Sequence, residues 1–262
     1  MAASPHRYSL TLAVLLLVAQ TAFSQSSGTA PGSRETLTYA IEWRLIPAGT
    51  ARLTQTTFAR TSSTAGSASG GEVRLHIESA GLVSRLFRVE DDYTSLQSGN
   101  SCVQSSFLVA HEGNRNKETR VFFDAANRKA TWLEKDFAKN VTNTQSVEIP
   151  PCVHDVLGGL YVLRGLHLDS GKTARIPISD GKKFVQARVE AQGREDIRTE
   201  MGTFKTIRYE VFLFDNILFK RSGHLHVWLT DDERRLPVQL QVRLQFTIGT
   251  INFRLIREEK PS

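Results

Sequence analysis

The stretch LPVQLQVRLQFT, residues 236–247, alternates apolar and polar side chains without a break. Successive side chains of a β-strand point to opposite faces, so this alternation predicts a strand with one apolar and one polar face. The apolar face comprises Leu236, Val238, Leu240, Val242, Leu244 and Phe246. Such a strand is typical of an antiparallel sheet that covers a core on one side and meets water on the other.

The same period of two continues on both sides of this stretch. Residues 37–45 and 251–255 alternate in the same way, and Asp180-Gly181 between two alternating runs indicates a hairpin. The small, polar residues 61–71 predict a flexible hairpin tip. We therefore expect a mainly β fold in which residues 36–257 form a single domain. Its architecture would be a large curled antiparallel sheet that closes toward a barrel or a sandwich, followed by a C-terminal tail at residues 258–262.

One segment, PPCVHDVLGGLYVLRGL at residues 150–166, breaks the alternation and predicts a short helix packed against the sheet. Asp155 is suited to cap its N-terminus, and apolar residues follow at helical spacing. Arg164 falls in the last turn, where a cation is favourable, and Gly165 can adopt the left-handed conformation that ends many helices. The adjacent Gly158-Gly159 pair suggests either close packing against the sheet or an imperfect helix.

The sequence Cys152-Val153-His154-Asp155 could also belong to the catalytic site of a cysteine hydrolase. Catalytic groups usually converge from distant segments, and an exported cysteine with one available partner tends to be oxidised. The chain has two cysteines. We expect a structural disulfide between Cys102 and Cys152, with two buried free thiols as the alternative.

His224 and His226 lie on one face of an expected strand, as in some zinc sites. The pair supplies half of a metal site, and no spacing singles out a third ligand. The alternative is a polar face beside Trp228. The sequence contains neither a phosphate-binding loop nor a GxSxG motif nor a dinucleotide fingerprint, so we assign no catalytic residue and no cofactor.

The first 24 residues have the layout of a secretory signal peptide, with Arg7 before an apolar run and small residues at the cleavage site. A membrane anchor is the alternative, but the run is shorter than the ~20 residues that span a bilayer. No later run is that long, so we expect no transmembrane segment after cleavage. Residues 25–35 contain few apolar groups and predict a disordered lead-in.

The formal net charge is +6, from 33 basic and 27 acidic residues. The basic residues are scattered among acids, which argues against a nucleic-acid-binding surface.

Six stretches in this order resemble a known family: LTYAIEWRLIPAGTARL, FDAANRKATW, HDVLGGLYVLR, GREDIRTEMGTFKTIRYEV, VWLTDDERRLPVQL and GTINFRL. Together they are similar to the bacterial exported proteins grouped as domain of unknown function 3108. The resemblance implies a β-rich protein of the Gram-negative-type cell envelope, and hence a periplasmic location. It implies no catalytic residues.

Three functions are compatible with these observations. The first is an exported, non-catalytic envelope protein that binds or carries an apolar or lipid-like ligand on the face of residues 236–246. The second is a structural or assembly partner in the envelope, with protein partners unknown. The third is a metal-dependent or cysteine hydrolase at the histidine or cysteine positions described above.

Overall fold

The computed structural model describes residues 32–60, 68–244 and 249–260. The expected signal peptide and residues 25–31 of the expected lead-in lie outside the described residues. The remainder of the lead-in is not disordered, because the first strand already begins at Arg34. The last strand continues to Glu259, so the expected tail is shorter than residues 258–262. At both ends the neighbouring strands supply backbone partners beyond the boundaries that side-chain alternation suggested.

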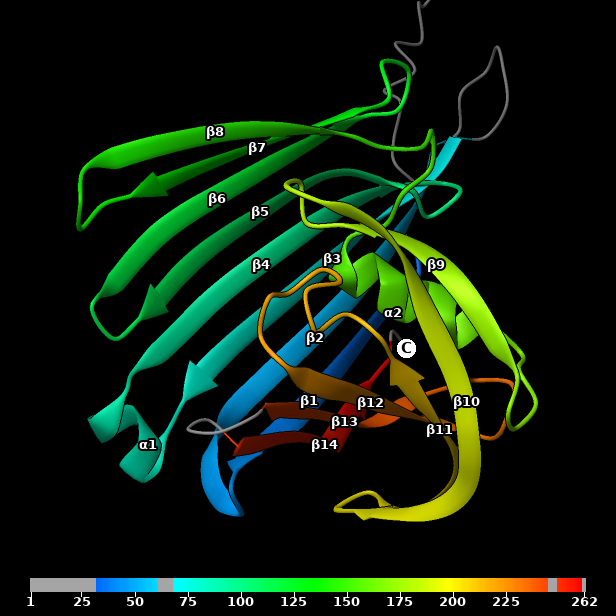
Figure 1. Ribbon diagram of the computed structural model, residues 1–262. Helices are drawn as coiled ribbons and strands as arrows, with labels where there is room; N and C mark the ends of the chain where they lie inside the picture. The colour runs from blue at the N-terminus through cyan, green and yellow to red at the C-terminus, as the bar shows by residue number, and fades with distance from the viewer. Residues whose placement is uncertain (1–31, 61–67, 245–248, 261–262) are drawn as a thin grey trace, which may run out of the picture.

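The described residues form one sheet of 14 strands, shown in Figure 1. In chain order the strands are β1 (Arg34–Trp43), β2 (Ile46–Arg60), β3 (Ala68–Ser79), β4 (Val89–Ser98), β5 (Val103–Glu112), β6 (Arg115–Asp124), β7 (Lys129–Asp136), β8 (Val141–Glu148), β9 (Thr173–Ser179), β10 (Phe184–Thr199), β11 (Gly202–Val211), β12 (Gly223–Thr230), β13 (Pro237–Leu244) and β14 (Gly249–Glu259).

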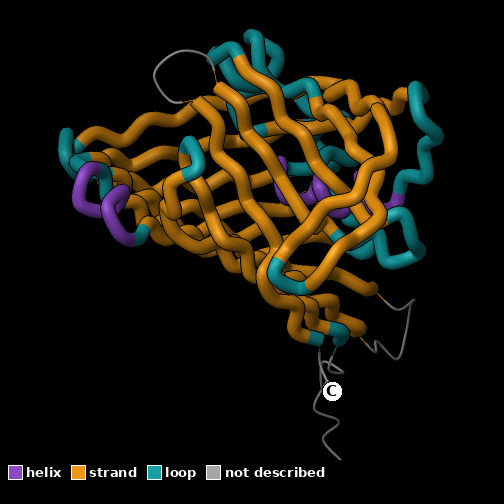
Figure 2. The backbone as a smooth tube through the Cα atoms, turned by 90° about the horizontal axis from the view of Figure 1, so that it is seen from below, coloured by secondary structure: helices purple, strands orange, loops and turns teal. Residues whose placement is uncertain are grey.

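Strands that are consecutive in the chain pair with each other, with the one exception of β8 and β9. The spatial order runs from β8 down to β1, then from β14 down to β9, so β1 pairs with β14 and joins two meanders. Every paired strand is antiparallel to its neighbour. The edges, β8 and β9, follow each other in the chain but do not pair as strands, so the sheet curls without closing. Figures 1 and 2 show this curl around a central helix.

Two helices occur in the described residues, whereas the sequence predicted one. The expected helix is α2 (Val156–Gly165), which lies inside the curl (Figures 1 and 2). The second, α1 (Gly81–Leu86), connects β3 to β4 and has no buried residue. Val83 packs against the larger core, but at six residues α1 is too short for a periodicity argument to identify it.

Neither described helix is long and apolar enough to cross a membrane.

Exposure also explains why sequence patterning missed one strand, β8. All residues of β8 except Val147 are exposed, so this edge strand shows no apolar alternation. The expected flexible tip at residues 61–71 is wrong at its end, because residues 68–71 belong to β3 and pair with β2. Residues 61–67 of that tip lie outside the described residues.

The larger core lies between α2 and the concave face formed by β1–β3 and β9–β14. Leu160 and Leu163 of α2 meet strand residues such as Leu37, Ile176 and Tyr209 there. The apolar faces of the alternating strands therefore point inward, as their sequence period requires.

A smaller core joins the wing formed by β5–β7 to the β9–β10 turn. Val121, Phe123 and Trp132 belong to it. Gly181 in that turn has a φ of +86°, and a Cβ atom there would lie 2.5 Å from a methyl carbon of Val121. The Asp-Gly hairpin signal thus marks the point where the turn packs against the wing.

Candidate functional site

Helix α2 begins where a capping residue follows a proline-rich segment. The Asp155 carboxylate accepts a hydrogen bond from the Gly158 backbone N–H at 2.6 Å, which satisfies one of the free donors of the first turn. Both interior glycines are buried, and a Cβ atom on Gly159 would lie 2.9 Å from the Cδ1 of Ile178. Close packing against β9 therefore accounts for Gly159, and a Cβ atom on Gly158 would lie 3.1 Å from the Nε2 of Gln97 in β4.

The other carboxylate oxygen of Asp155 links α2 to β4. Oδ2 accepts a hydrogen bond from the Tyr93 hydroxyl of β4 at 2.8 Å, and Asp155 is 2% exposed. Burial, and then the nearby Asp155 charge, raises the pKa of Tyr93 well above its ordinary value. The tyrosine therefore stays protonated and acts as the donor.

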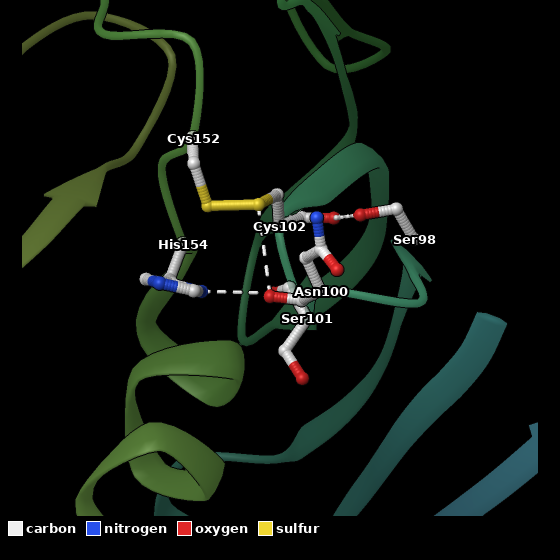
Figure 3. The surroundings of a disulfide bond; sticks show 6 residues. All are labelled: Ser98, Asn100, Ser101, Cys102, Cys152 and His154. Carbon is white, nitrogen blue, oxygen red and sulfur yellow. Dashed lines mark hydrogen bonds between the residues drawn. A yellow bond between two sulfur atoms is a disulfide. The ribbon is translucent and has the colours of Figure 1, made fainter. Parts of the chain in front are cut away.

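The cysteine–histidine segment is a structural joint. Cys102 and Cys152 form a disulfide, with their Cα atoms 5.1 Å apart, shown in Figure 3. The Nδ1 of His154 lies 2.8 Å from the backbone oxygen of Ser101, to which it can donate (Figure 3). The His154 backbone is bonded to β9 through Pro177. With its sulfur in a disulfide, Cys152 has no free thiol for the nucleophilic chemistry of the cysteine-hydrolase hypothesis.

Arginine side chains hold the other end of α2. Arg164 makes two hydrogen bonds to the carboxylate of Glu35 in β1, at 2.5 and 3.1 Å, and donates to the Arg235 carbonyl oxygen at 3.1 Å. Arg235 in turn donates to the carbonyl oxygen of Leu166, just after the helix. The expected left-handed Gly165 is wrong, because Gly165 has no positive φ. Guanidinium groups from the helix and from the β12–β13 loop provide the stabilisation at this end.

An apolar cavity of about 270 Å³ lies between α2 and the concave face of the sheet. Its walls come from α2, from β1–β3, β9 and β11–β14, and from the β11–β12 loop; they include Leu53, Ile77, Leu160, Ile178, Leu240 and Phe253. Among the described residues, no charged side chain lines the cavity. The Tyr39 hydroxyl donates to the backbone oxygen of Pro237 at 2.8 Å, so its hydrogen-bonding capacity is used elsewhere. The cavity therefore offers contact to hydrocarbon and no partner for a polar group.

The apolar face expected on β13 divides into parts with different surroundings. Leu240 and Val242 line the cavity, whereas Leu236 and Val238 are fully buried in the core. Leu244 is half-buried and is not among the lining residues.

Phe246, the last residue of that expected face, lies outside the described residues.

The opposite face of β13 is not uniformly exposed to solvent, contrary to expectation. Gln239 is 8% exposed. It contributes with Ile197 and Thr199, from the end of β10, to a hollow on the outer side of the sheet. The β10–β11 hairpin thus folds back over a face that the alternation assigned to solvent.

The β11–β12 loop, residues 212–222, was not recognised in the sequence as part of a site. Phe214 and Phe219 both line the cavity, with their ring centroids 5.5 Å apart. Phe219 is 37% exposed, so the cavity meets the surface at this loop. The sequence signal that could have indicated this part of the site is a short run that is rich in phenylalanine and lacks a period of two.

The two histidines lie on one face of β12, as their spacing predicts, and that face is the outer one. His224 Nδ1 lies 2.8 Å from a carboxylate oxygen of Glu210, and His226 Nε2 lies 3.9 Å from the other. Burial lowers the pKa of His226. Within the described part of the chain, no group of three or more potential ligand side chains is arranged to hold a metal ion. Metal binding at this pair stays a prediction.

Asp91 places a carboxyl beside the cavity. It is paired across the sheet with the lining residue Ile77, and its side chain accepts the His111 backbone N–H at 3.0 Å. Burial, and then the nearby Glu112 carboxylate, raises the pKa of Asp91 to about 6. A carboxyl with a raised pKa favours the folded state while it is protonated.

We expect Asp91→Asn to be more stable than the parent protein at pH 8, by about 1 kcal/mol after allowance for solvent screening. The stabilisation that Asp91 provides when protonated is complete below about pH 4 and is lost as pH rises through about 6. The advantage of the variant should therefore shrink toward pH 4. Urea unfolding across this range measures it, with the exposed Asp196→Asn as the control. An advantage independent of pH would contradict the prediction.

The fold and the site define a curled antiparallel sheet around a helix held at both ends, with an apolar cavity between them. The chain belongs to the family described as "Protein of unknown function (DUF3108)", whose model matches residues 38–256. No curated protein matches the chain.

The solved structures that are similar to this chain include the following two. One is a β-barrel-like protein of domain of unknown function DUF1849 from Brucella abortus, with a TM-score of 0.49 and 9% identity over 89% of this chain and 100% of that chain. The other is a Bacteroides fragilis protein with a YmcC-like fold, with a TM-score of 0.30 and 9% identity over 88% of this chain and 97% of that chain. Similarity at this level carries no functional conclusion.

Proposed function

We propose that this chain is an exported, non-catalytic protein that binds the hydrocarbon part of a lipid-like molecule in the cavity beside α2. The observation that carries the proposal is the cavity itself, about 270 Å³ with an apolar lining. Ligand pockets typically measure ~300–1,000 Å³, so this cavity lies near the lower end of that range. A single acyl chain or a ligand of similar size fits it better than a bulky one.

Energetics support an occupant. The side chains that line the cavity lack van der Waals partners on that side, and water in the cavity would find almost no polar partner. Filling the cavity with hydrocarbon restores those contacts and removes apolar ligand surface from water. Because no charged group of the described residues lines the cavity, the polar end of such a ligand would stay outside, near the Phe219 loop.

Export is supported by the signal-like residues 1–24 and by the disulfide, since disulfides persist in oxidising compartments. For a family of bacterial type, the corresponding compartment is the periplasm. An apolar ligand in that aqueous space needs a protein that shields it from water.

A matched pair of substitutions on β13 tests ligand binding. Val242 lines the cavity, whereas its neighbour Arg243 is exposed on the outer face. We expect Val242→Trp to weaken binding of the neutral fluorophore phenylnaphthylamine by about tenfold, because the indole occupies the cavity. Arg243→Trp should bind as the parent protein does. A thermal unfolding curve for each variant establishes that it is folded.

Equal affinity in all three proteins would contradict the proposal. So would the absence of any co-purifying lipid in extracts and native mass spectra of protein from its own host, combined with no fluorophore binding.

The assembly-partner alternative rests on β8, an edge strand whose residues 141–146 are all exposed. An exposed edge can accept a strand from another chain. Crosslinking in the native host distinguishes the assembly role from ligand binding. The assembly role requires a reproducible protein partner and no apolar ligand.

A further inference from the structure

Exposed apolar side chains gather at one end of the sheet. We define the apolar tip as Leu45 and Ile46 of the β1–β2 turn together with Leu82, Leu86 and Phe87 of α1 and its C-terminal neighbour. Leu45 is 84% exposed and Leu86 is 71% exposed. Isolated exposed leucines are common, but five large apolar side chains at one end of a sheet call for an explanation.

The two parts of the tip are neighbours in space. Gly49 of β2 pairs with Ser79 of β3, immediately before α1, and the Ala80 backbone N–H donates to the Ala48 carbonyl oxygen at 2.8 Å. Figure 1 shows α1 projecting from the end of the sheet between β3 and β4. The tip therefore projects from the end of the sheet.

Folding does not account for the leucine in the turn. Arg44 and Leu45 form a two-residue hairpin turn with φ of 49° and 69°. Such turns favour Asn-Gly, because bulky residues are strained at positive φ. Leu45 is thus both strained and exposed, and backbone strain of this kind is frequently associated with function.

Folding also does not account for the exposed leucines of α1. None of its residues is buried, so Leu82 and Leu86 contribute little to a core. A polar loop would connect β3 to β4 equally well. Leu82 and Leu86 are therefore available for an outside surface, whereas Val83 packs against the larger core.

Arginines accompany the apolar residues. Arg44 adjoins Leu45 in the turn, and Arg85 lies in the last turn of α1 with no ion-pair partner among the described residues. Arg88 is paired with Glu90 at 2.7 Å, and Arg115 of the neighbouring β5–β6 turn is paired with Glu112 at 2.5 Å.

Acids also lie near this end: Glu42 precedes the turn, Glu78 accepts a hydrogen bond from Thr50, and Asp91 follows Glu90. The two segments that form the tip, residues 44–46 and 81–88, contain Arg44, Arg85 and Arg88 and no acidic residue, in keeping with an anionic partner.

We propose that the apolar tip docks onto the surface of a phospholipid bilayer that contains anionic headgroups. Shallow insertion removes the leucine side chains from water, while guanidinium groups pair with lipid phosphates. A deformable bilayer accommodates a projecting tip, whereas a protein partner would need a matching groove. The inference goes beyond ligand binding and does not depend on it, since no tip residue lines the cavity.

Vesicle flotation of the full secreted chain tests the proposal. We expect the chain to bind vesicles of phosphatidylcholine with phosphatidylglycerol more strongly than vesicles of phosphatidylcholine alone. The variant Leu45→Asn/Leu82→Gln/Leu86→Gln should lose at least about tenfold in partitioning. Asparagine suits a positive φ, so Leu45→Asn should not weaken the fold. Arg85→Glu should reduce binding to the anionic vesicles alone.

Two controls keep the test specific. Phe122→Gln removes an apolar side chain that is 57% exposed on β6, away from the tip, and should bind vesicles normally. Val242→Trp, which fills the cavity, should also bind vesicles normally, so failure of the ligand proposal and failure of this one are distinguishable. No vesicle binding by the parent chain, or unchanged binding by the triple variant, would overturn the proposal. A concentration-dependent dimer that the triple variant abolishes would assign the tip to a second copy instead and would likewise overturn it.

Discussion

Cys102→Ala/Cys152→Ala is expected to lower the free energy of unfolding by about 4 kcal/mol. The two cysteines are 50 positions apart, so the disulfide closes a long loop and removes much of the conformational freedom of the unfolded chain. That loop contains β5–β8, so the disulfide ties the start of the wing to the segment that leads into α2 (Figure 3). Urea unfolding of the oxidised parent and the variant measures the difference.

Reduction provides an independent control. The parent protein treated with reductant should unfold at the same urea concentration as the double variant. Intact mass before and after denaturing reduction should differ by two protons if the pair is oxidised. A variant as stable as the oxidised parent would contradict the prediction.

Asp155→Ala is expected to destabilise the protein by about 3 kcal/mol. Loss of an N-cap costs about 1 kcal/mol. The change also leaves the buried hydroxyl of Tyr93 without its partner, which costs about 1–3 kcal/mol more. Because Asp155 is bonded both to the first turn of α2 and to β4, the variant should also bind an apolar fluorophore more weakly.

Asp155→Asn is the matched control. Its amide oxygen can still accept from the Gly158 N–H, and its amide nitrogen can donate to the Tyr93 hydroxyl. We therefore expect most of the stability and fluorophore binding to be retained. If the asparagine and alanine variants were equally unstable, the carboxylate charge, rather than the two hydrogen bonds, would be the stabilising feature.

Local patterns predicted the features that depend on neighbouring residues. The alternation at residues 236–244 identified β13, and Asp180-Gly181 identified the β9–β10 turn. The capping role of Asp155 followed from its place before a helical stripe, and the disulfide followed from a count of two cysteines. Each of these inferences needs only the chemistry of a short segment, because strand period, turn geometry and capping act within a few residues.

Features that depend on distant segments were not predictable in this way. Strand β8 is almost wholly exposed, so no apolar pattern marks it, and α1 has only six residues, too few for its apolar side chains to show a helical period. The outer face of β13 became partly buried because a hairpin from elsewhere folds over Gln239. The arginines at the end of α2 come from segments about 70 positions apart.

The sequence by itself therefore determined that this chain builds two-faced strands, one capped helix and one cross-link, since these follow from side-chain order along the backbone. The tertiary structure decided that β1 pairs with β14, that the edges β8 and β9 stay apart, and that an apolar cavity lies beside α2. The physical reason is that burial drives an apolar face to leave water without specifying which distant face it meets. Backbone pairing and close packing across the whole chain select that partner and the space left between them.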